Sequence, residues 1–276
     1  MSQTSAPRVR VMGVLNVTPD SFSDGGRFDD PAAALAQARR LIADGADMLD
    51  VGGESTRPGA AAVDEAEEVA RVVPLIAAIR AESDIAISVD TMKPAVARAA
   101  VAAGATIWND VTALRHAPDS LATAAELGSE VVLMHMQGEP GAMQVAPRYD
   151  DVVAEVTAFL AERAEAAMAA GVARAKIWLD PGVGFGKHMT RHNLPLIHGL
   201  DRIVALGFPM LLGVSRKRFI SALDGEKREP DQRLGGSIAA ALAGAAAGVA
   251  AVRVHDVRET VQALRVWRAI AQAGIR

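Results

Sequence analysis

Short apolar runs recur along the chain, and each stops at a small, polar or charged residue before a helix-like stretch begins. The clearest runs are Val9–Leu15, Ile85–Val89, Val131–Met134, Ile177–Leu179 and Met210–Val214. Their residues do not alternate between apolar and polar, which is typical of parallel strands buried on both faces. The eight stops are Asn16, Gly52-Gly53-Glu54, Asp90, Asn109-Asp110, His135, Asp180, Ser215-Arg216-Lys217 and His255-Asp256. This rhythm predicts an α/β fold, a single (β/α)8 barrel whose strand ends meet at one face.

Helix-like stretches separate the runs, and several of them begin with a proline or end before a glycine. We expect helices at Pro31–Ala43, Val63–Arg80, Pro94–Ala103, Pro118–Leu127, Asp151–Ala170, Asn193–Leu206, Ser237–Ala247 and Val257–Ala273. The first and second strand-to-helix loops are long, and the charged segment Asp224–Arg233 is expected to lengthen the seventh helix. A length of 276 residues suits one TIM barrel domain over residues 1–276, with a flexible start at 1–7.

Composition narrows the possible partners. With 33 acidic and 29 basic residues, the formal charge is -4, which gives no long-range attraction to nucleic acid or to an anionic membrane. The uncharged stretch Leu234–Val252 is rich in Ala and Gly, so we interpret it as a packed barrel helix and strand rather than a membrane span. There is no cysteine, which excludes a thiol nucleophile. Met1–Arg10 lacks the apolar stretch of a secretory signal, and a cytoplasmic location is expected.

The first two loops carry candidate binding groups. Asn16 stands where the first strand should end, and its amide oxygen is a suitable ligand for Mg²⁺ beside phosphate oxygens. A turn or capping role is the plainer alternative for a lone Asn. The second loop, which contains Thr56 and Arg57, combines backbone N–H groups, hydroxyls and a guanidinium, a chemistry that suits an anion or a polar heterocycle.

Four residues at strand ends form a mixed set of hydrogen-bond donors and acceptors. Asp90, Asn109 and Asp180 follow the third, fourth and sixth runs, and Lys217 follows the seventh. Such a set fits a polar ring better than a metal cage, because a carboxylate pairs at two points with an amino group beside a ring N–H. Helix capping is the alternative for any one of them.

Cations gather after the last two runs. Ser215-Arg216-Lys217-Arg218 opens the seventh helix, where free N–H groups favour an anion. Arg253 and His255 are two residues apart on a strand and therefore face the same side. An Arg and a His in a barrel mouth are costly to bury without a partner, so a phosphate is a natural complement.

Together these segments resemble the dihydropteroate synthase family of pterin-binding enzymes. The resemblance is carried by Asn16 to Gly26, Gly52 to Gly59, Asp180 to Lys187, Ser215 to Lys217 and Arg253 to Asp256, in the family's order. It implies condensation of 6-hydroxymethyl-7,8-dihydropterin diphosphate with p-aminobenzoate in folate synthesis. The products would be 7,8-dihydropteroate and diphosphate, and sulfonamides would inhibit as mimics of p-aminobenzoate.

The resemblance also implies residue roles. Asp90, Asn109, Asp180 and Lys217 would hold the pterin, and Arg253 and His255 would hold the diphosphate, with Asn16 reaching Mg²⁺. Asp90, Lys217, Arg253 and His255 would form the catalytic set. Thr56 and Arg57 would shape the second of two mobile loops, Thr18–Gly26 and Ser55–Gly59, and the start of the seventh helix would face the p-aminobenzoate carboxylate. Similar enzymes are usually dimers, so a homodimer is expected.

Two alternatives and two departures stay open. A pterin-dependent methyltransferase domain shares a barrel and acidic pterin-reading residues, but the set Asn16, Arg253 and His255 argues against it. A catalytically silent pterin-binding barrel is the second alternative. Relatives commonly have one residue fewer between Lys187 and His192, and some carry Ser at the position of Arg218. His135 and Asp110 have no assigned role.

Overall fold

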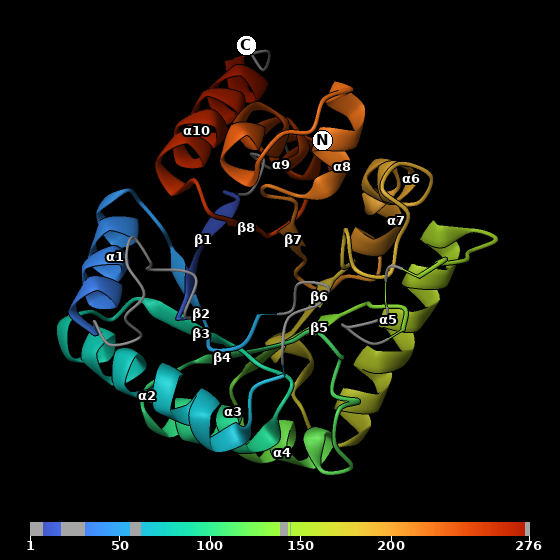
Figure 1. The fold of residues 1–276 in the computed structure, drawn as a ribbon. Helices are drawn as coiled ribbons and strands as arrows, with labels where there is room; N and C mark the ends of the chain where they lie inside the picture. Colours follow the sequence, from blue (N-terminus) through green and yellow to red (C-terminus); the bar gives the residue numbers. More distant parts are fainter. Residues whose placement is uncertain (1–7, 18–30, 56–61, 139–142, 144, 274–276) are drawn as a thin grey trace.

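The computed structural model describes residues 8–17, 31–55, 62–138, 143 and 145–273. All of its strands are parallel, and they surround a common axis (Figure 1). Their order in the sheet is β6-β5-β4-β3-β2-β1-β8-β7, and a bridge between Leu179 and Met210 joins β6 to β7. The strands are β1 (Arg10–Asn16), β2 (Met48–Gly52), β3 (Ala86–Asp90), β4 (Ile107–Asp110), β5 (Glu130–Met134), β6 (Ile177–Asp180), β7 (Leu211–Gly213) and β8 (Ala251–Val254). The predicted (β/α)8 barrel is confirmed.

Helices form the outer ring around the sheet (Figure 1). They are α1 (Pro31–Ala43), α2 (Glu65–Glu82), α3 (Pro94–Ala102), α4 (Ser120–Leu127), α5 (Val152–Ala169), α6 (Asn193–His198), α7 (Leu200–Val204), α8 (Arg218–Asp224), α9 (Leu234–Ala247) and α10 (Val257–Ala273). Short 3-10 turns, η2 (Arg174–Lys176) and η3 (Pro230–Arg233), precede β6 and α9. Among the described residues, no helix is both long and apolar enough to cross a membrane.

Two helix predictions were wrong in detail. The expected helix Asn193–Leu206 is divided at Gly199 into α6 and α7. A Cβ at Gly199 would lie 2.9 Å from Val153 Cγ1 of α5, so this close approach depends on the glycine. The segment Asp224–Arg233 does not lengthen α8, because Gly225 ends that helix in the left-handed conformation. The segment instead closes with η3, which leads directly into α9.

The barrel interior is built in layers that follow from the two-residue period of a strand. An apolar layer fills the end of the barrel where the strands begin, with Met12, Met48, Ile107, Val132, Trp178, Leu211 and Ala251 packed together. Two residues further along the strands, the inward positions become Asp50, Ser88, Asn109, Met134, Asp180, Gly213 and Arg253. The apolar layer closes one end of the barrel, so this polar layer lies at the base of the opposite mouth.

Candidate active site

Arg253 lies at the centre of a charged network in the polar layer. Its Nε donates to Asp50 Oδ2 at 2.5 Å, and its Nη2 donates to Asp90 Oδ2 at 2.7 Å. Asn109 Nδ2 also donates to Asp50 Oδ2, at 3.2 Å. The structure therefore brings together three residues predicted for the site, and the fully buried Asp50 joins them. Arg253 thus has two carboxylate partners within the protein.

Burial and charge oppose each other within this network. Burial alone would lower the pKa of Arg253, but Asp50, Asp90 and Asp180 raise it above its ordinary value. Burial raises the pKa of Asp90 to about 7, against the effect of Arg253, while the negative charge of Asp50 adds to the rise. An Arg that stays charged thus lies beside a carboxyl group poised near neutral pH.

Asp180 and Lys217 lie on the neighbouring part of the mouth. Asp180 Oδ1 accepts from the Gly182 N–H at 2.7 Å, and a Cβ added at Gly213 would lie 3.9 Å from Asp180 Oδ2. The ammonium of Lys217 lies 4.2 Å from the centre of the Phe185 ring, a cation–π contact. Burial and the charge of Arg253 lower the pKa of Lys217 to about 8, against the effects of Asp180 and Asp90, which raise it. Burial likewise raises the pKa of Asp180.

His255 borders the same mouth next to Ser215. Its Nδ1 lies 3.0 Å from Ser215 Oγ, and its backbone N–H donates to the same hydroxyl oxygen at 3.2 Å. Burial lowers the pKa of His255 to about 3, with Arg253 and Arg216 acting in the same direction. The imidazole is therefore neutral at pH 7 and can accept or donate a hydrogen bond, according to its tautomer.

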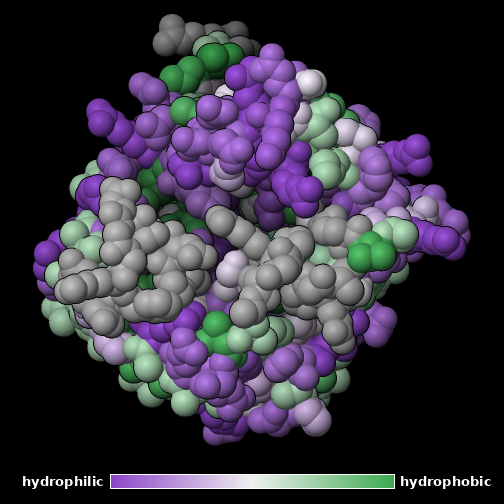
Figure 2. Space-filling view, in the orientation of Figure 1, coloured by the Kyte–Doolittle hydropathy of each residue, from purple (hydrophilic) through white to green (hydrophobic). Residues whose placement is uncertain are grey.

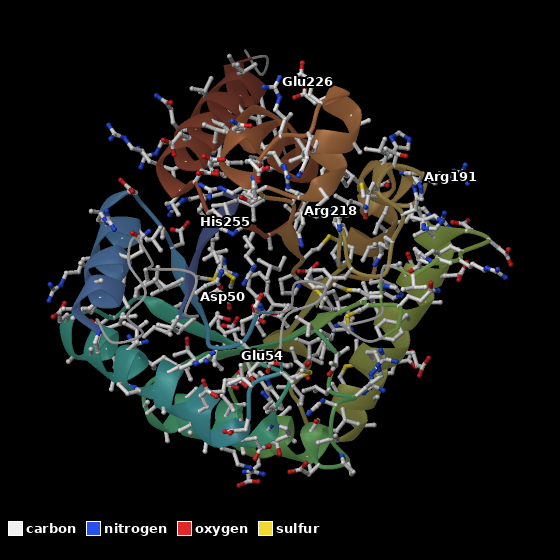
Figure 3. All side chains as sticks on the ribbon, viewed as in Figure 1. Asp50, Glu54, Arg191, Arg218, Glu226 and His255 are labelled. Atoms are coloured by element: carbon white, nitrogen blue, oxygen red, sulfur yellow. The ribbon has the colours of Figure 1, made fainter. Side chains whose placement is uncertain are left out.

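The cations after β7 are Arg216, Lys217 and Arg218, and the backbone conformation at Arg216 sets its direction. Arg216 has a positive φ of 59° and pairs with Asp256, its Nε lying 3.0 Å from Asp256 Oδ2. Arg218 is exposed, and Figure 3 shows it above the mouth. Lys217 contacts Phe185 in the loop after β6, so Lys217 and Arg216 have different partners. The helix that begins at these cations, α8, is only seven residues long.

Asn16 and Asp90 border one position at the rim. Asn16, Gly52 and Asp90 are aligned in register across β1, β2 and β3. A Cβ added at Gly52 would lie 3.4 Å from Asn16 Oδ1 and 3.8 Å from Asp90 Oδ2. Among the described residues, no group of three His, Cys, Asp or Glu side chains could hold a metal by itself. These two oxygens fit a Mg²⁺ ion only when phosphate and water oxygens complete its shell.

Thr56 and Arg57 fall outside the described residues, but Glu54 and Val63, which flank that segment in the sequence, belong to a buried ion cluster. Lys93 Nζ donates to Glu54 Oε2 at 2.5 Å, to Glu68 Oε2 at 2.6 Å and to the Val63 carbonyl at 2.7 Å. Burial would lower the pKa of Lys93, yet its bonds to Glu54 and Glu68 raise it. In Figure 3, Glu54, Asp50 and His255 lie toward the barrel axis, whereas Arg191 and Glu226 lie at the edge.

The sequence contained signals for two residues that reasoning on strand ends missed. Asp50 is the one charged residue in the apolar stretch Met48–Gly52, and a charge within a buried strand requires a partner. Lys187 lies in the Gly-rich segment after β6 and is 1% exposed. Its ammonium lies 2.9 Å from Nδ1 of the unassigned His135. Asp110, also unassigned, accepts from the N–H groups of Thr112 and Leu114 and so supports a loop.

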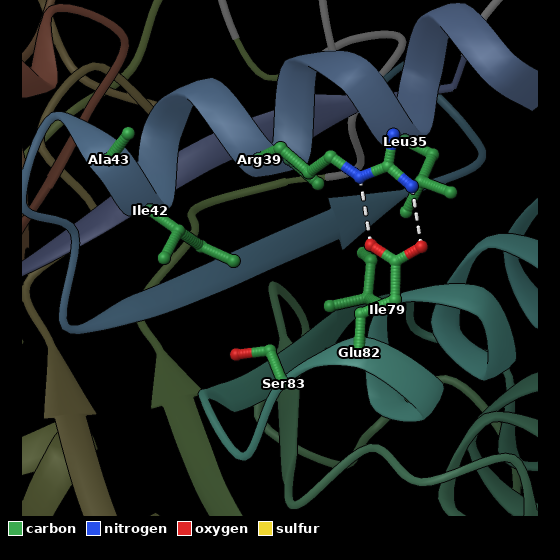
Figure 4. A pocket seen from close by; sticks show the side chains of 8 residues that line it. Leu35, Arg39, Ile42, Ala43, Ile79, Glu82 and Ser83 are labelled. Carbon is green, nitrogen blue, oxygen red and sulfur yellow. Dashed lines mark hydrogen bonds and ion pairs between the residues drawn. The ribbon is translucent and has the colours of Figure 1, made fainter.

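A pocket of about 260 Å³ lies elsewhere, on the outside of the barrel between α1 and α2. Figure 4 shows that Arg39 spans it to reach Glu82, with Nε to Oε2 at 2.8 Å and Nη2 to Oε1 at 2.5 Å. The rest of its lining is apolar except for Ser83, and it consists of Leu35, Ala38, Ile42, Ala43, Ile79 and Ser83. The space-filling view shows mainly hydrophilic residues over the described parts of the face that carries the barrel mouth (Figure 2).

Comparison with known proteins places the chain among its relatives. A family model described as pterin binding enzyme matches residues 12–255. The dihydropteroate synthase of Escherichia coli (strain K12) is 48% identical over 263 residues, which cover 95% of this chain and 92% of the relative. A solved structure of Xanthomonas albilineans dihydropteroate synthase with 4-aminobenzoic acid is 53% identical, covers 96% and 93% of the two chains, and superposes with a TM-score of 0.89.

A second solved structure agrees. The Yersinia pestis dihydropteroate synthase in a sulfonamide drug complex is 45% identical, with 96% of this chain and 95% of that chain covered and a TM-score of 0.90. The chain therefore belongs to the family of pterin-binding enzymes that includes the dihydropteroate synthases.

Proposed function

We propose that this protein condenses 6-hydroxymethyl-7,8-dihydropterin diphosphate with p-aminobenzoate to form 7,8-dihydropteroate and diphosphate, a transferase step of folate synthesis. The observation that carries the proposal is the polar layer at the barrel mouth, which places acceptors, donors and cations within one network around Arg253. The close relatives are dihydropteroate synthases over nearly their whole length, which supports the same reaction.

The pterin ring is assigned to Asp90, Asn109, Asp180 and Lys217. A pterin presents an amino group beside ring N–H groups on one edge and a carbonyl on another, so it needs both carboxylate acceptors and N–H donors. Asp180 already accepts from Gly182 through Oδ1, and a carboxylate has further acceptor positions for the ring. Lys217 is held against Phe185, which leaves its ammonium hydrogens available to an acceptor on the ring.

The diphosphate is assigned to Arg253 and His255. A guanidinium carries five N–H donors, so contacts with Asp50 and Asp90 leave donors for phosphate oxygens. Neutral His255 can donate a hydrogen bond without requiring a second buried charge. Asn16, beside Asp90 at the rim, would hold Mg²⁺ together with substrate oxygens. When bound, that ion would neutralise negative charge on the diphosphate.

We infer a dissociative substitution. The bond between the pterin methylene carbon and the diphosphate oxygen breaks first, and both electrons leave with the diphosphate. The electron-rich ring stabilises the positive charge on the carbon, and Arg253 and His255 stabilise the departing anion. The p-aminobenzoate nitrogen then forms the new bond and releases one proton to solvent. An aromatic amine is unprotonated near pH 7, so positioning replaces a strong general base.

The remaining assignments rest on the family resemblance. Thr56 and Arg57 would act from the second loop. Residues 1–276 would form one domain, the protein would be a cytoplasmic homodimer, and sulfonamides would compete with p-aminobenzoate.

One assay separates this proposal from a methyltransferase domain and from a silent pterin-binding barrel. Net release of diphosphate from the pterin substrate should require both Mg²⁺ and p-aminobenzoate, because the pterin cation recombines with diphosphate unless the amine captures it. Absence of release at saturating substrate would reject the proposal, and methyl transfer from a methylated folate to a corrinoid would favour the first alternative.

A further inference from the structure

Lys187 is a buried cation whose ammonium is surrounded by neutral acceptors. Its Nζ lies 2.9 Å from His135 Nδ1, 2.9 Å from the Gly182 carbonyl and 3.0 Å from the Phe185 carbonyl. The side chain is among the largest that are fully buried, and no ion pair to it is found among the residues that the structure describes. Burying an unpaired charge is costly, and burial lowers the pKa of Lys187 to about 7, although the charge of Asp180 raises it. An apolar side chain would fill the same volume at lower cost.

The three acceptors come from two neighbouring loops. Gly182 and Phe185 belong to the segment after β6, and His135 follows β5 directly. Burial lowers the pKa of His135 to about 3, so its imidazole is neutral and Nδ1 can accept from the ammonium. The loops also touch directly, since a Cβ added at Gly182 would lie 1.9 Å from the His135 carbonyl oxygen. Lys187 thus ties the end of β5 to the segment that follows Asp180.

This tie ends at two residues assigned to the pterin. Phe185, whose carbonyl accepts from Lys187, presents its ring to the Lys217 ammonium at 4.2 Å. Gly182, whose carbonyl also accepts from Lys187, donates its N–H to Asp180 Oδ1 at 2.7 Å. Burial raises the pKa of Asp180, and the charge of Lys187 acts in the opposite direction, as do Lys217 and Arg253. One ammonium therefore orients the partners of both Asp180 and Lys217.

We propose that Lys187 is a positioning residue for the pterin site, which fixes Gly182 and Phe185 and supplies a positive charge behind Asp180. The proposal rests on the proposed function, because that function assigns Asp180 and Lys217 to the pterin. Lys187 does not itself bind the ring. Its role has two separable parts, hydrogen bonding to the loop and a charge that acts on Asp180. The other titratable groups that face it are His135 and, more remotely, His192.

Two substitutions separate the hydrogen bonds of Lys187 from its charge. Lys187→Gln keeps N–H donors but removes the charge, and Lys187→Met removes both. Lys176→Met is the matched control, because Lys176 is an exposed lysine that precedes β6 at the opposite end of the barrel and bonds the Gly128 carbonyl. Affinity for 6-hydroxymethylpterin is measured by calorimetry, and kcat/KM is followed against pH.

We expect Lys187→Met to weaken pterin binding by about tenfold or more, since small displacements of a site's supporting groups have effects of this size. Lys187→Gln should weaken it less. Both should move the acid limb of kcat/KM to higher pH, because a positive charge that lowers the pKa of Asp180 has been removed. Lys176→Met should change neither the pterin affinity nor the pH dependence of kcat/KM. A role limited to folding would lower the melting temperature without moving the pH limb.

A double-mutant cycle tests the route through Phe185. If Lys187 acts through that ring, Lys187→Met should cost less affinity in a Phe185→Leu background than in the wild type. Additive effects, or pterin affinity within twofold of wild type in folded Lys187→Met, would overturn the proposal. If Lys187→Met does not fold, the same comparisons of pterin affinity are made with Lys187→Gln. Wild-type protein that fails to bind the pterin would instead reject the proposed function.

Discussion

Arg253 and Asp50 form the innermost ion pair of the barrel mouth, with Nε 2.5 Å from Oδ2, although 203 positions separate them in the sequence. Asp50 is fully buried on β2, whereas Arg253 on β8 is 22% exposed toward the mouth. The carboxylate therefore fixes the direction of the guanidinium from behind and leaves its outer edge for a ligand.

Replacing Asp50 by Asn should weaken this support. A hydrogen bond to a charged group contributes about 2 kcal/mol, so we expect Asp50→Asn to lower the free energy of unfolding by roughly that amount. The value of kcat/KM should fall by about tenfold or more, because Arg253 loses its fixed orientation. Denaturant unfolding and steady-state kinetics measure the two effects.

Asp224→Asn is the matched control for Asp50→Asn. Asp224 pairs with Arg228 on the surface, where both side chains are more than 40% exposed. Its removal should change stability by less than about 0.5 kcal/mol and leave the rate unchanged. Equal effects of the two substitutions would contradict the role given to Asp50.

Asp180→Asn should weaken pterin binding sharply. An amide can still accept the Gly182 N–H, so the loop keeps its contact, but an amide oxygen beside an NH₂ group cannot pair at two points with adjacent N–H donors of the ring. We expect an affinity loss of about a hundredfold, near 3 kcal/mol. Calorimetry with the pterin measures it, and unchanged binding would remove Asp180 from the site.

The pH dependence of kcat/KM should show an alkaline limb from Lys217. Burial lowers the pKa of this lysine to about 8, so the ammonium is charged below that pH and loses its proton above it. The value of kcat/KM, which reports the free enzyme, should therefore fall as the pH rises through about 8. Lys217→Arg should remove this limb, since a guanidinium stays charged. A limb that is unchanged in Lys217→Arg would assign the titration elsewhere.

Lys93→Met should destabilise the barrel. It would leave Glu54 and Glu68 buried without their shared cation, and breaking a buried ion pair on one side costs about 3–5 kcal/mol. The pKa of Lys93 is raised, so its contribution is fully present at neutral pH and is lost only in strongly alkaline solution, as the pH rises through the raised value. Thermal unfolding at pH 7 measures the loss, and a change below about 1 kcal/mol would contradict it.

Much of the fold could be predicted from sequence, because buried parallel strands leave uninterrupted apolar runs and their ends share one face. Asp90, Asn109 and Asp180 were predicted as site residues for this reason, and Arg253 was predicted because it is two residues from His255 on one strand. Asp50 was missed, since it lies within an apolar run rather than at its end. The break at Gly199 depends on contact with Val153 of a distant helix, which no local pattern records.

At the site, too, some features follow from the local sequence and others only from contacts between distant segments. The sequence places Arg216 beside Lys217, but a left-handed backbone at Arg216 directs its guanidinium to Asp256 and away from the cluster. His135 had no role until the structure placed its Nδ1 against Lys187. Conformation and contacts between loops decide these roles, and neither follows from spacing along the chain.

The most direct test of the account is the stoichiometry of the reaction. Purified protein is mixed with 6-hydroxymethyl-7,8-dihydropterin diphosphate, p-aminobenzoate and Mg²⁺, and both products are quantified by mass spectrometry. We predict equal amounts of 7,8-dihydropteroate and diphosphate, with both lost in Arg253→Met. Diphosphate release without dihydropteroate, or formation of neither product by folded wild-type protein, would contradict the proposed condensation.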